Sequence, residues 1–346
     1  MITLIENFNA DLSARFFGVL FAFAATYFLT KLLMDRLPKD GGREFAHDGK
    51  LSKGKPRGAG IIFVLVFALS AFIFVKPDTE KSIYILLIVL SMFTGFLDDA
   101  AKSPWGELKK GILDLVIAAA VAGNFLYFNY EKTDRIFLET VQTSLRLPLI
   151  LYAILITALV WGSVNVTNCT DGVDGLSGTL AIITIMSIAH LIPADGAWNE
   201  WKEGASGAWR ELFAEFTDYR HLAFIFAACI AAYLIFNATP SLIMMGDAGS
   251  RAMGLFIAVL ALRTFSPIMY IPFGIVIILD GGLGLLKVTI IRLFKVNIMK
   301  KLRTPLHDHV RKNLGWSNTQ TVFRFAIIQL FISALTLALC HINYVN

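Results

Sequence analysis

The chain has 346 residues, of which 56% are hydrophobic and only 16% are charged. A soluble globular domain of this size needs more charge on its surface, so the composition excludes an ordinary soluble protein. The net charge of +5 does not indicate a nucleic-acid partner, because no basic run interleaved with aromatic residues lies in a soluble segment. The three cysteines are odd in number and widely spaced, which argues against a disulfide framework and against a zinc site.

Ten apolar runs follow one another along the chain and predict an all-α polytopic integral membrane protein. The runs are continuous and long enough to span a bilayer as helices, whereas a transmembrane barrel would show segments of about ten residues with alternating polarity. No small-residue cleavage site follows the first run, so we interpret it as a retained helix and not as a signal peptide. We expect helices at 14–34, 58–75, 83–97, 111–128, 147–164, 178–193, 221–237, 252–265, 271–293 and 323–342.

Lys and Arg are distributed unevenly over the segments that connect these runs. Segments 31–57, 98–110 and 287–324 carry eight, three and nine of them, and with Arg251 they hold 21 of the 31 in the chain. Such an excess marks the cytoplasmic side of a membrane protein. Because the number of expected spans is even, both termini are then expected on the extracytoplasmic side.

The chain is expected to form a single membrane-embedded domain over 1–346. In its one long outer loop, four apolar residues recur at helical spacing, which predicts a helix lying in the membrane interface near 199–218. These residues are Trp209, Leu212, Phe213 and Phe216. No internal repeat is visible, whereas the two halves of an inverted-repeat transporter would resemble each other.

Four polar motifs stand out, and all four fall on the expected cytoplasmic side. They are GFLDDAAK (95–102), NVTNCTDGVDG (165–175), NATPSLIMMGDAGS (237–250) and TPLHDHVRKNLGW (304–316). No comparable cluster of Asp or His lies on the other side. This one-sidedness predicts a single functional site at the cytoplasmic membrane surface.

Two of the motifs contain pairs of carboxylates. Asp98 and Asp99 end a predicted helix, where acids oppose the helix dipole and repel each other, so we favour a function over a solvated helix end. Asp171 and Asp174 are three residues apart and would share one face of a helical turn. A helix N-cap is the structural alternative for Asp174, but capping does not account for the neighbouring Asn, Thr and Asp residues.

The other two motifs add one more acid and two histidines. Asp247 precedes a predicted helix, where it is either a comfortable N-terminal acid or a hard oxygen ligand for Mg²⁺. His307 and His309 lack further ligands at zinc spacing. Among their basic neighbours they suit phosphate or sugar contacts, and ordinary loop histidines are the structural alternative. Oxygen ligands surrounded by Lys and Arg indicate phosphate chemistry assisted by a divalent cation.

One acid, Asp280, lies inside a predicted span, and an intramembrane acid indicates function by default. Pairing with Lys287, seven residues further along the same helix face, is the structural alternative. Pro272 and Gly274 permit this helix to bend, which makes it a candidate for an apolar groove that holds a lipid tail.

The motifs GFLDD, NxxNxxDGxDGL, MGDxGS and a His-containing last loop, in this order over ten predicted helices, resemble the polyprenyl-phosphate N-acetylhexosamine-1-phosphate transferases. The resemblance covers about 50–340. It implies a Mg²⁺-dependent enzyme of the bacterial cytoplasmic (inner) membrane that transfers a phospho-sugar from a UDP-sugar to a lipid phosphate and releases UMP. A homodimer is a possible assembly.

The resemblance also implies roles for the motif residues. The metal ligand is expected to be Asp247, and the catalytic residues are expected to be Asp98, Asp99, Asp174 and His307, with Asp98 or Asp99 acting on the lipid phosphate. Substrate binding is expected from Lys53, Lys55, Lys109, Lys110, Asn168, Asp171 and His309.

Two signals bear on which sugar is transferred. PLHDHVRKNLGW followed by VFRFAII is similar to the last loop of family members that use UDP-MurNAc-pentapeptide and undecaprenyl phosphate to make lipid I, although Asp308 replaces a central His. The K-P-R-G sequence at 55–58 is closer to members that use UDP-GlcNAc. The last-loop match is longer, so we expect UDP-MurNAc-pentapeptide, with UDP-GlcNAc as the alternative enzyme and a secondary transporter as the alternative class.

Overall fold

The computed structural model describes residues 10–42, 52–75, 77–101, 103–130, 135–138, 143–192, 207–264, 266–296 and 299–345. Helices dominate it, and the one small sheet is an antiparallel hairpin that pairs Arg135 with Arg146. The elements are α2 (Ala10–Leu33), η1 (Met34–Arg36), α3 (Gly60–Ser70), η2 (Ala71–Val75), α4 (Thr79–Asp99), α5 (Glu107–Asn129), β1 (Arg135–Leu138), β2 (Thr143–Arg146), α6 (Leu149–Thr170), α7 (Leu176–Leu191), α8 (Gly207–Asn237), α9 (Gly246–Leu262), η3 (Pro267–Met269), α10 (Tyr270–Phe273), α11 (Ile275–Phe294), α12 (Leu306–Leu314) and α13 (Asn318–Val345).

Each of the ten predicted runs coincides with a helix or a helix pair. Within the described residues, six helices are long and apolar enough to cross a membrane, and a bent pair would make a seventh. The α3–η2 segment and α7 are apolar but shorter. The chain is therefore a multi-pass α-helical membrane protein, and ten spans with both termini outside stay a prediction.

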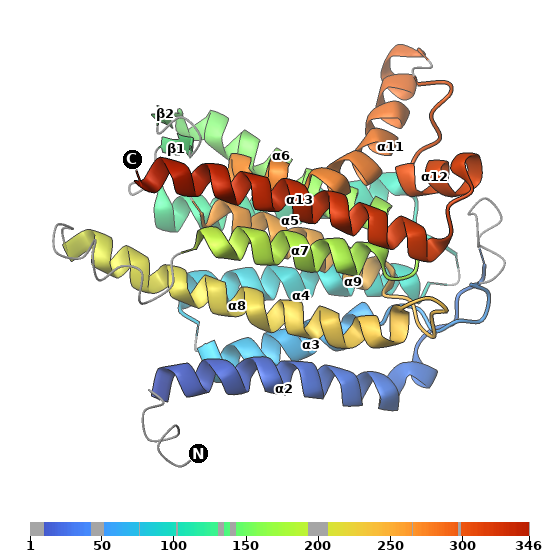
Figure 1. Ribbon diagram of the computed structural model, residues 1–346, viewed down its shortest axis with the longest axis horizontal. Helices are drawn as coiled ribbons and strands as arrows, with labels where there is room; N and C mark the ends of the chain where they lie inside the picture. Colours follow the sequence, from blue (N-terminus) through green and yellow to red (C-terminus); the bar gives the residue numbers. More distant parts are fainter. Residues whose placement is uncertain are drawn as a thin grey trace.

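The start of α2, the end of α13 and the hairpin lie at the same end of the bundle (Figure 1). The ends of the helices that carry the polar motifs lie at the other end, where α12 packs (Figure 1). The predicted interfacial helix near 199–218 falls partly outside the described residues, at 199–206. From Gly207 onwards the backbone is one continuous helix, α8.

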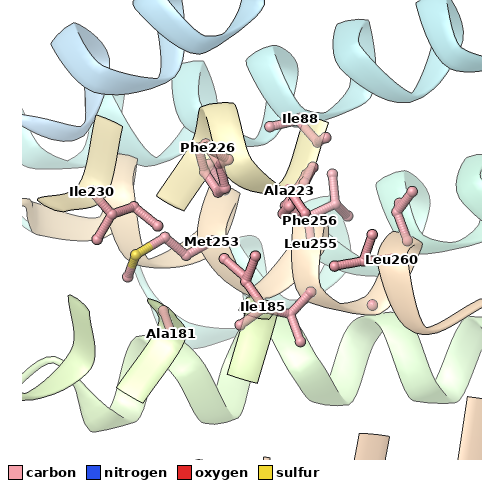
Figure 2. Packing of buried hydrophobic residues seen from close by; sticks show 14 of the residues in the cluster. Ile88, Ala181, Ile185, Ala223, Phe226, Ile230, Met253, Leu255, Phe256 and Leu260 are labelled. Carbon is pink, nitrogen blue, oxygen red and sulfur yellow. The ribbon is translucent and has the colours of Figure 1, made fainter. Parts of the chain in front are cut away.

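The helix α9 forms the centre of the molecule, and every one of its residues is buried. Figure 2 shows Met253 and Phe256 of α9 among apolar side chains from α4, α7 and α8, including Phe226. Lipid tails are as apolar as these side chains, so helices in a bilayer associate mainly through close packing. Here the packing is tight at Gly254, where an added Cβ would lie 2.6 Å from the carbonyl oxygen of Ser163.

The predicted bend of the ninth helix is confirmed, and it is sharp. The segment Pro267–Phe273 and α11 meet at Gly274 with an angle of 91° between them. A break in a membrane helix exposes backbone groups that need new partners. Gln329 of α13 supplies them: its Oε1 accepts from the Val276 N–H at 3.0 Å, and its Nε2 donates to the Pro272 carbonyl at 3.0 Å.

Candidate active site

The ends of α4 and α9 meet through Asp99. Its carboxylate accepts hydrogen bonds from the backbone N–H groups of Asp247 at 3.1 Å and Ala248 at 3.0 Å, and the side chain is fully buried. Asp99 therefore lies at the N-terminus of α9, where the helix dipole favours negative charge. Asp99 thus occupies these two amides of the first turn of α9.

Three cations join the carboxylates of separate helices. Lys110 of α5 forms ion pairs with both Asp98 and Asp247, the latter at 2.9 Å. Arg57, in the loop before α3, reaches Asp99 at 2.8 Å and Asp247 at 3.3 Å. Burial alone would lower the pKa of Arg57, but the charges of Asp99, Asp247 and Asp40 outweigh it and raise that pKa, so Arg57 remains charged.

A third cation, Arg251 of α9, lies 3.4 Å from Asp247 and 3.0 Å from Asp114 of α5.

The two acids of GFLDD are not solvated, because the side chains of Asp98 and Asp99 are only 2% and 0% exposed. Buried charges are costly unless they are paired. We call these residues the carboxylate cluster: Asp98, Asp99, Asp114 and Asp247, with Arg57, Lys110 and Arg251.

The second motif begins in the last turns of α6, which ends at Thr170, and its residues 171–175 form a non-helical turn before α7, so the prediction that Asp171 and Asp174 share a helix face is wrong. Gly175 takes a positive φ of 82° and is the N-cap of α7, so the N-cap alternative for Asp174 is wrong as well. Asp174 instead lies 3.8 Å from Lys55 and accepts from the backbone N–H of Ser241 at 3.4 Å.

Two further contacts connect the second motif to its neighbours. Asn168 Nδ2 donates to the hydroxyl of Ser250 in α9 at 2.9 Å. His307 of α12 lies so close to Gly172 that a Cβ added there would touch its ring, 2.8 Å from Cε1. All four polar motifs thus converge at one end of the bundle.

His307 is held by Asp280, the acid inside α11. Asp280 accepts from the His307 backbone N–H at 2.7 Å and binds ring Nδ1 at 2.8 Å. With Nδ1 occupied, Nε2 is the ring atom that faces Gly172. The alternative pairing with Lys287 is wrong, because the Lys287 ammonium donates to the carbonyls of Met299 and Leu302.

Burial lowers the pKa of His307, but the charge of Asp280 and the hydrogen bond to it act in the opposite direction. The net effect is a raised pKa, which favours the imidazolium form.

Three predicted substrate contacts lie away from the carboxylate cluster. Lys53 is exposed. Lys109 is exposed too and stacks over the ring of Trp105 at 3.3 Å from its centroid. It does not point the same way as Lys110, because adjacent residues on a helix face different directions. His309 Nδ1 accepts from the backbone N–H of Arg303 at 3.3 Å. Their roles in binding stay predictions.

Sequence reasoning assigned no role to Arg57, Asp114 and Arg251. A signal for Asp114 was present, since it is an acid inside a predicted span, as Asp280 is. From the sequence, Arg57 and Arg251 contribute only to the excess of cytoplasmic charge, because nothing local shows which carboxylate a cation will contact.

The donor set of the carboxylate cluster fits a magnesium ion. The ion prefers oxygen ligands and is commonly held by one or two carboxylates together with substrate phosphates. Asp98 and Asp247 offer such a pair, because both contact the same ammonium group of Lys110. Within the described residues, no group of three or more His, Cys, Asp and Glu is arranged to bind a metal ion, so substrate oxygens would have to complete the coordination.

A model for glycosyl transferase family 4 matches residues 82–265, a region that includes Asp98, Asp174 and Asp247. A phospho-N-acetylmuramoyl-pentapeptide-transferase of Treponema pallidum (strain Nichols) is 38% identical over 307 residues, which cover 85% of this chain and 80% of the relative. The chain belongs to this family. The resemblance inferred from the four motifs is confirmed, and the protein is a phospho-sugar transferase.

More distant relatives in the family carry the same name. The phospho-N-acetylmuramoyl-pentapeptide-transferase of Campylobacter jejuni (strain RM1221) is 28% identical over 294 residues, 82% of this chain and 80% of the relative. That of Clostridium perfringens (strain SM101 / Type A) is 25% identical over 294 residues, 80% of this chain and 79% of the relative. In each case the similarity therefore extends over most of this chain and most of the relative.

Proposed function

We propose that this family 4 enzyme transfers phospho-MurNAc-pentapeptide from UDP-MurNAc-pentapeptide to undecaprenyl phosphate, producing lipid I and UMP for peptidoglycan synthesis. The name shared by its relatives supports this substrate. The observation that carries the proposal is the carboxylate cluster, where Asp98, Asp99 and Asp247 meet Arg57 and Lys110 at one end of the bundle. The excess of Lys and Arg supports a cytoplasmic location for this end, in the inner membrane.

In the proposed reaction, an oxygen of the lipid phosphate attacks the β-phosphorus of the UDP-sugar. The bond from this phosphorus to the bridging oxygen breaks, and UMP leaves with that oxygen. Asp98 or Asp99 accepts the proton of the lipid phosphate or positions it. Arg57 and Lys110 favour the binding of phosphate oxygens, since oriented cations stabilise charge that develops in the transition state.

Mg²⁺ held by Asp247, with Asp98 beside it, would neutralise charge on the diphosphate oxygens. Asn168 and Asp171 orient the nucleotide, and Asp174 positions Lys55. His307, fixed by Asp280 with Nε2 free of that bond, contacts the sugar-phosphate. UDP-GlcNAc stays the alternative substrate because of the K-P-R-G sequence. Arg57 of that sequence forms an ion pair with Asp99 of the carboxylate cluster, so this residue is not free to distinguish one sugar from another. Family membership counts against a transporter.

The test is UMP release by the purified enzyme in detergent with Mg²⁺ and undecaprenyl phosphate. UDP-MurNAc-pentapeptide and UDP-GlcNAc are compared, and we expect turnover with the first alone. Asp99→Asn should lower kcat by about a hundredfold or more while nucleotide affinity changes little, because a general base or electrostatic contact acts in the transition state. Turnover with UDP-GlcNAc alone would contradict the substrate, and near-normal kcat in Asp99→Asn would remove Asp99 from the chemistry.

A further inference from the structure

A second charged site lies between the end of α11 and the start of α12, and none of its lining residues belongs to the carboxylate cluster. Four cations line a cavity of about 410 Å³ there: Lys287, Lys300, Lys301 and Arg303. We call it the basic pocket. No acid lines it, and no carboxylate among the described residues forms an ion pair with any of the four cations. Like charges held together repel one another, so an anion that enters the cavity would be stabilised.

The wall of the basic pocket is fixed by hydrogen bonds. The Lys287 ammonium donates to the carbonyl oxygens of Met299 at 3.2 Å and Leu302 at 2.8 Å. The Leu302 N–H donates to the Met299 carbonyl at 3.0 Å and closes a turn. Thr304 packs against α11, where an added Cβ on Gly284 would lie 3.6 Å from it. These contacts fix Lys287 and the backbone of the turn, and all four cations line the same cavity.

The position of the basic pocket relates it to the proposed reaction. Lys287 lies seven residues after Asp280 on α11, which corresponds to about 10 Å along the helix. Asp280 holds His307 against the turn that contains Gly172. The pocket therefore lies further along α11 than the proposed contact between His307 and the sugar-phosphate. Figure 1 shows α11 and α12 side by side at this end of the molecule. A substituent on the bound sugar could extend from His307 into the pocket.

We propose that the basic pocket binds the free carboxylates of the peptide stem carried by the sugar nucleotide. This inference rests on the proposed function. A stem of five residues spans up to about 17 Å when extended, which is enough to reach the cavity from His307. Thr304 and Asn313 also line the pocket and can hydrogen-bond to peptide groups. The lining is dominated by charged and polar side chains, so it suits a peptide and not a polyprenyl chain.

The experiment measures KM and kcat for UMP release with two forms of UDP-MurNAc-pentapeptide. One has free carboxylates on the stem, and the other has the same stem with these carboxylates converted to amides. The enzymes are wild type, Lys300→Gln, Lys301→Gln and the double variant. The matched control is Lys295→Gln, which removes an exposed charge that does not line the cavity.

For the carboxylate stem, we expect the double variant to raise KM about tenfold with kcat nearly unchanged, because each contact is charge-assisted but partly exposed. Wild type should show a similar rise in KM on the amidated stem, and the double variant should add little to it. Lys295→Gln should behave as wild type. Each single variant changes one exposed side chain and is expected to fold. If the double variant does not fold, a smaller rise in KM in the single variants, on the carboxylate stem but not on the amidated stem, tests the proposal instead.

Two results would overturn the proposal. One is an equal effect of the double variant on both stems, or no effect on either. The other is a rise in the KM for undecaprenyl phosphate alone, which would assign the pocket to an anionic lipid headgroup. Failure of the proposed function is distinguishable, because wild-type enzyme would then not release UMP with either form of the pentapeptide substrate.

Discussion

Asp98 and Asp99 are neighbours in the sequence but have different surroundings. Asp98 accepts from the Trp105 backbone N–H at 2.6 Å and pairs with Lys110, whereas Asp99 binds Arg57 and the first amides of α9. Consecutive helical residues point in different directions, and here each carboxylate faces a different helix. Besides the role proposed for either acid in the reaction, Asp99 also fixes α9 to α4, and Asp98 faces the Lys110 ammonium that also contacts Asp247.

A second contrast at the residue scale lies within α12, where His307 binds a carboxylate, whereas His309 contacts none among the residues that the structure describes. The ordinary pKa of histidine is 6.5, and that of His307 is raised. A raised pKa in the folded state means that the ion pair stabilises the protein fully below about pH 6.5, and that this contribution is lost as the pH rises through the raised pKa.

We therefore expect Asp280→Asn to lower the thermal midpoint most at pH 6 and progressively less towards pH 9. The midpoint is measured in detergent across this range for wild type and variant. His309→Gln is the control and should show no such trend. A difference between wild type and Asp280→Asn that stays constant from pH 6 to pH 9 would contradict the assigned ion pair.

At the scale of elements, the site depends on how closely α4 and α9 approach each other. An added Cβ on Gly95 would lie 2.6 Å from the backbone nitrogen of Ala248, and one on Gly60 would lie against the backbone of Gly249. Such contacts allow a helix to carry Asp98 and Asp99 directly to the N-terminus of its neighbour. Small residues at membrane helix interfaces permit this approach of two backbones.

Gly95→Ala should separate α4 from α9 and shift Asp99 from the amides that it caps. We expect a loss of stability of about 1–3 kcal/mol from overpacking and a loss of activity of about a hundredfold, since a displacement of about 1 Å in a site has that effect. Thermal midpoint and UMP release measure both. Gly123→Ala in α5 is the matched control, because nothing lies within 4 Å of its added Cβ. Equal behaviour of the two variants would contradict the assigned role of Gly95.

At the scale of the whole molecule, buried charge gathers at both ends of the bundle. The end away from the carboxylate cluster contains Arg263, the C-cap residue of α9. Arg263 is fully buried and donates to Glu80 of α4 at 2.9 Å and to Asn129 of α5 at 2.6 Å. Asn129 donates in turn to Glu80 at 2.7 Å. This network joins three helices near the hairpin and is assigned to structure rather than to the reaction.

Glu80→Gln should destabilise the protein by up to about 3–5 kcal/mol, because it leaves the buried Arg263 without this carboxylate. The double variant Glu80→Gln/Arg263→Met should recover part of the loss. KM and kcat of the folded variants should stay near wild type, since Glu80 and Asp99 are about 28 Å apart along α4. Altered kcat at an unchanged thermal midpoint would contradict a structural role.

Much of the architecture was predictable because it depends on local sequence. Continuous apolar runs placed all ten helical segments, and Pro272 and Gly274 marked the bend of 91° before α11. Motif order identified the family and placed Asp98, Asp99, Asp171, Asp174, Asp247 and His307 on one side. Boundaries were less accurate: α9 begins at Gly246 rather than at 252, since its first turn is polar and does not add to an apolar run.

The sequence by itself determined the membrane class, the family and the end of the bundle at which the polar motifs gather. Only the tertiary structure decided which charges meet: Asp280 with His307 and not Lys287, Arg57 with Asp99, Arg251 with Asp114, and four cations around one cavity. The physical reason is that hydropathy and helical spacing act within a segment, whereas the partner of a buried charge is set by which helices pack together and how closely.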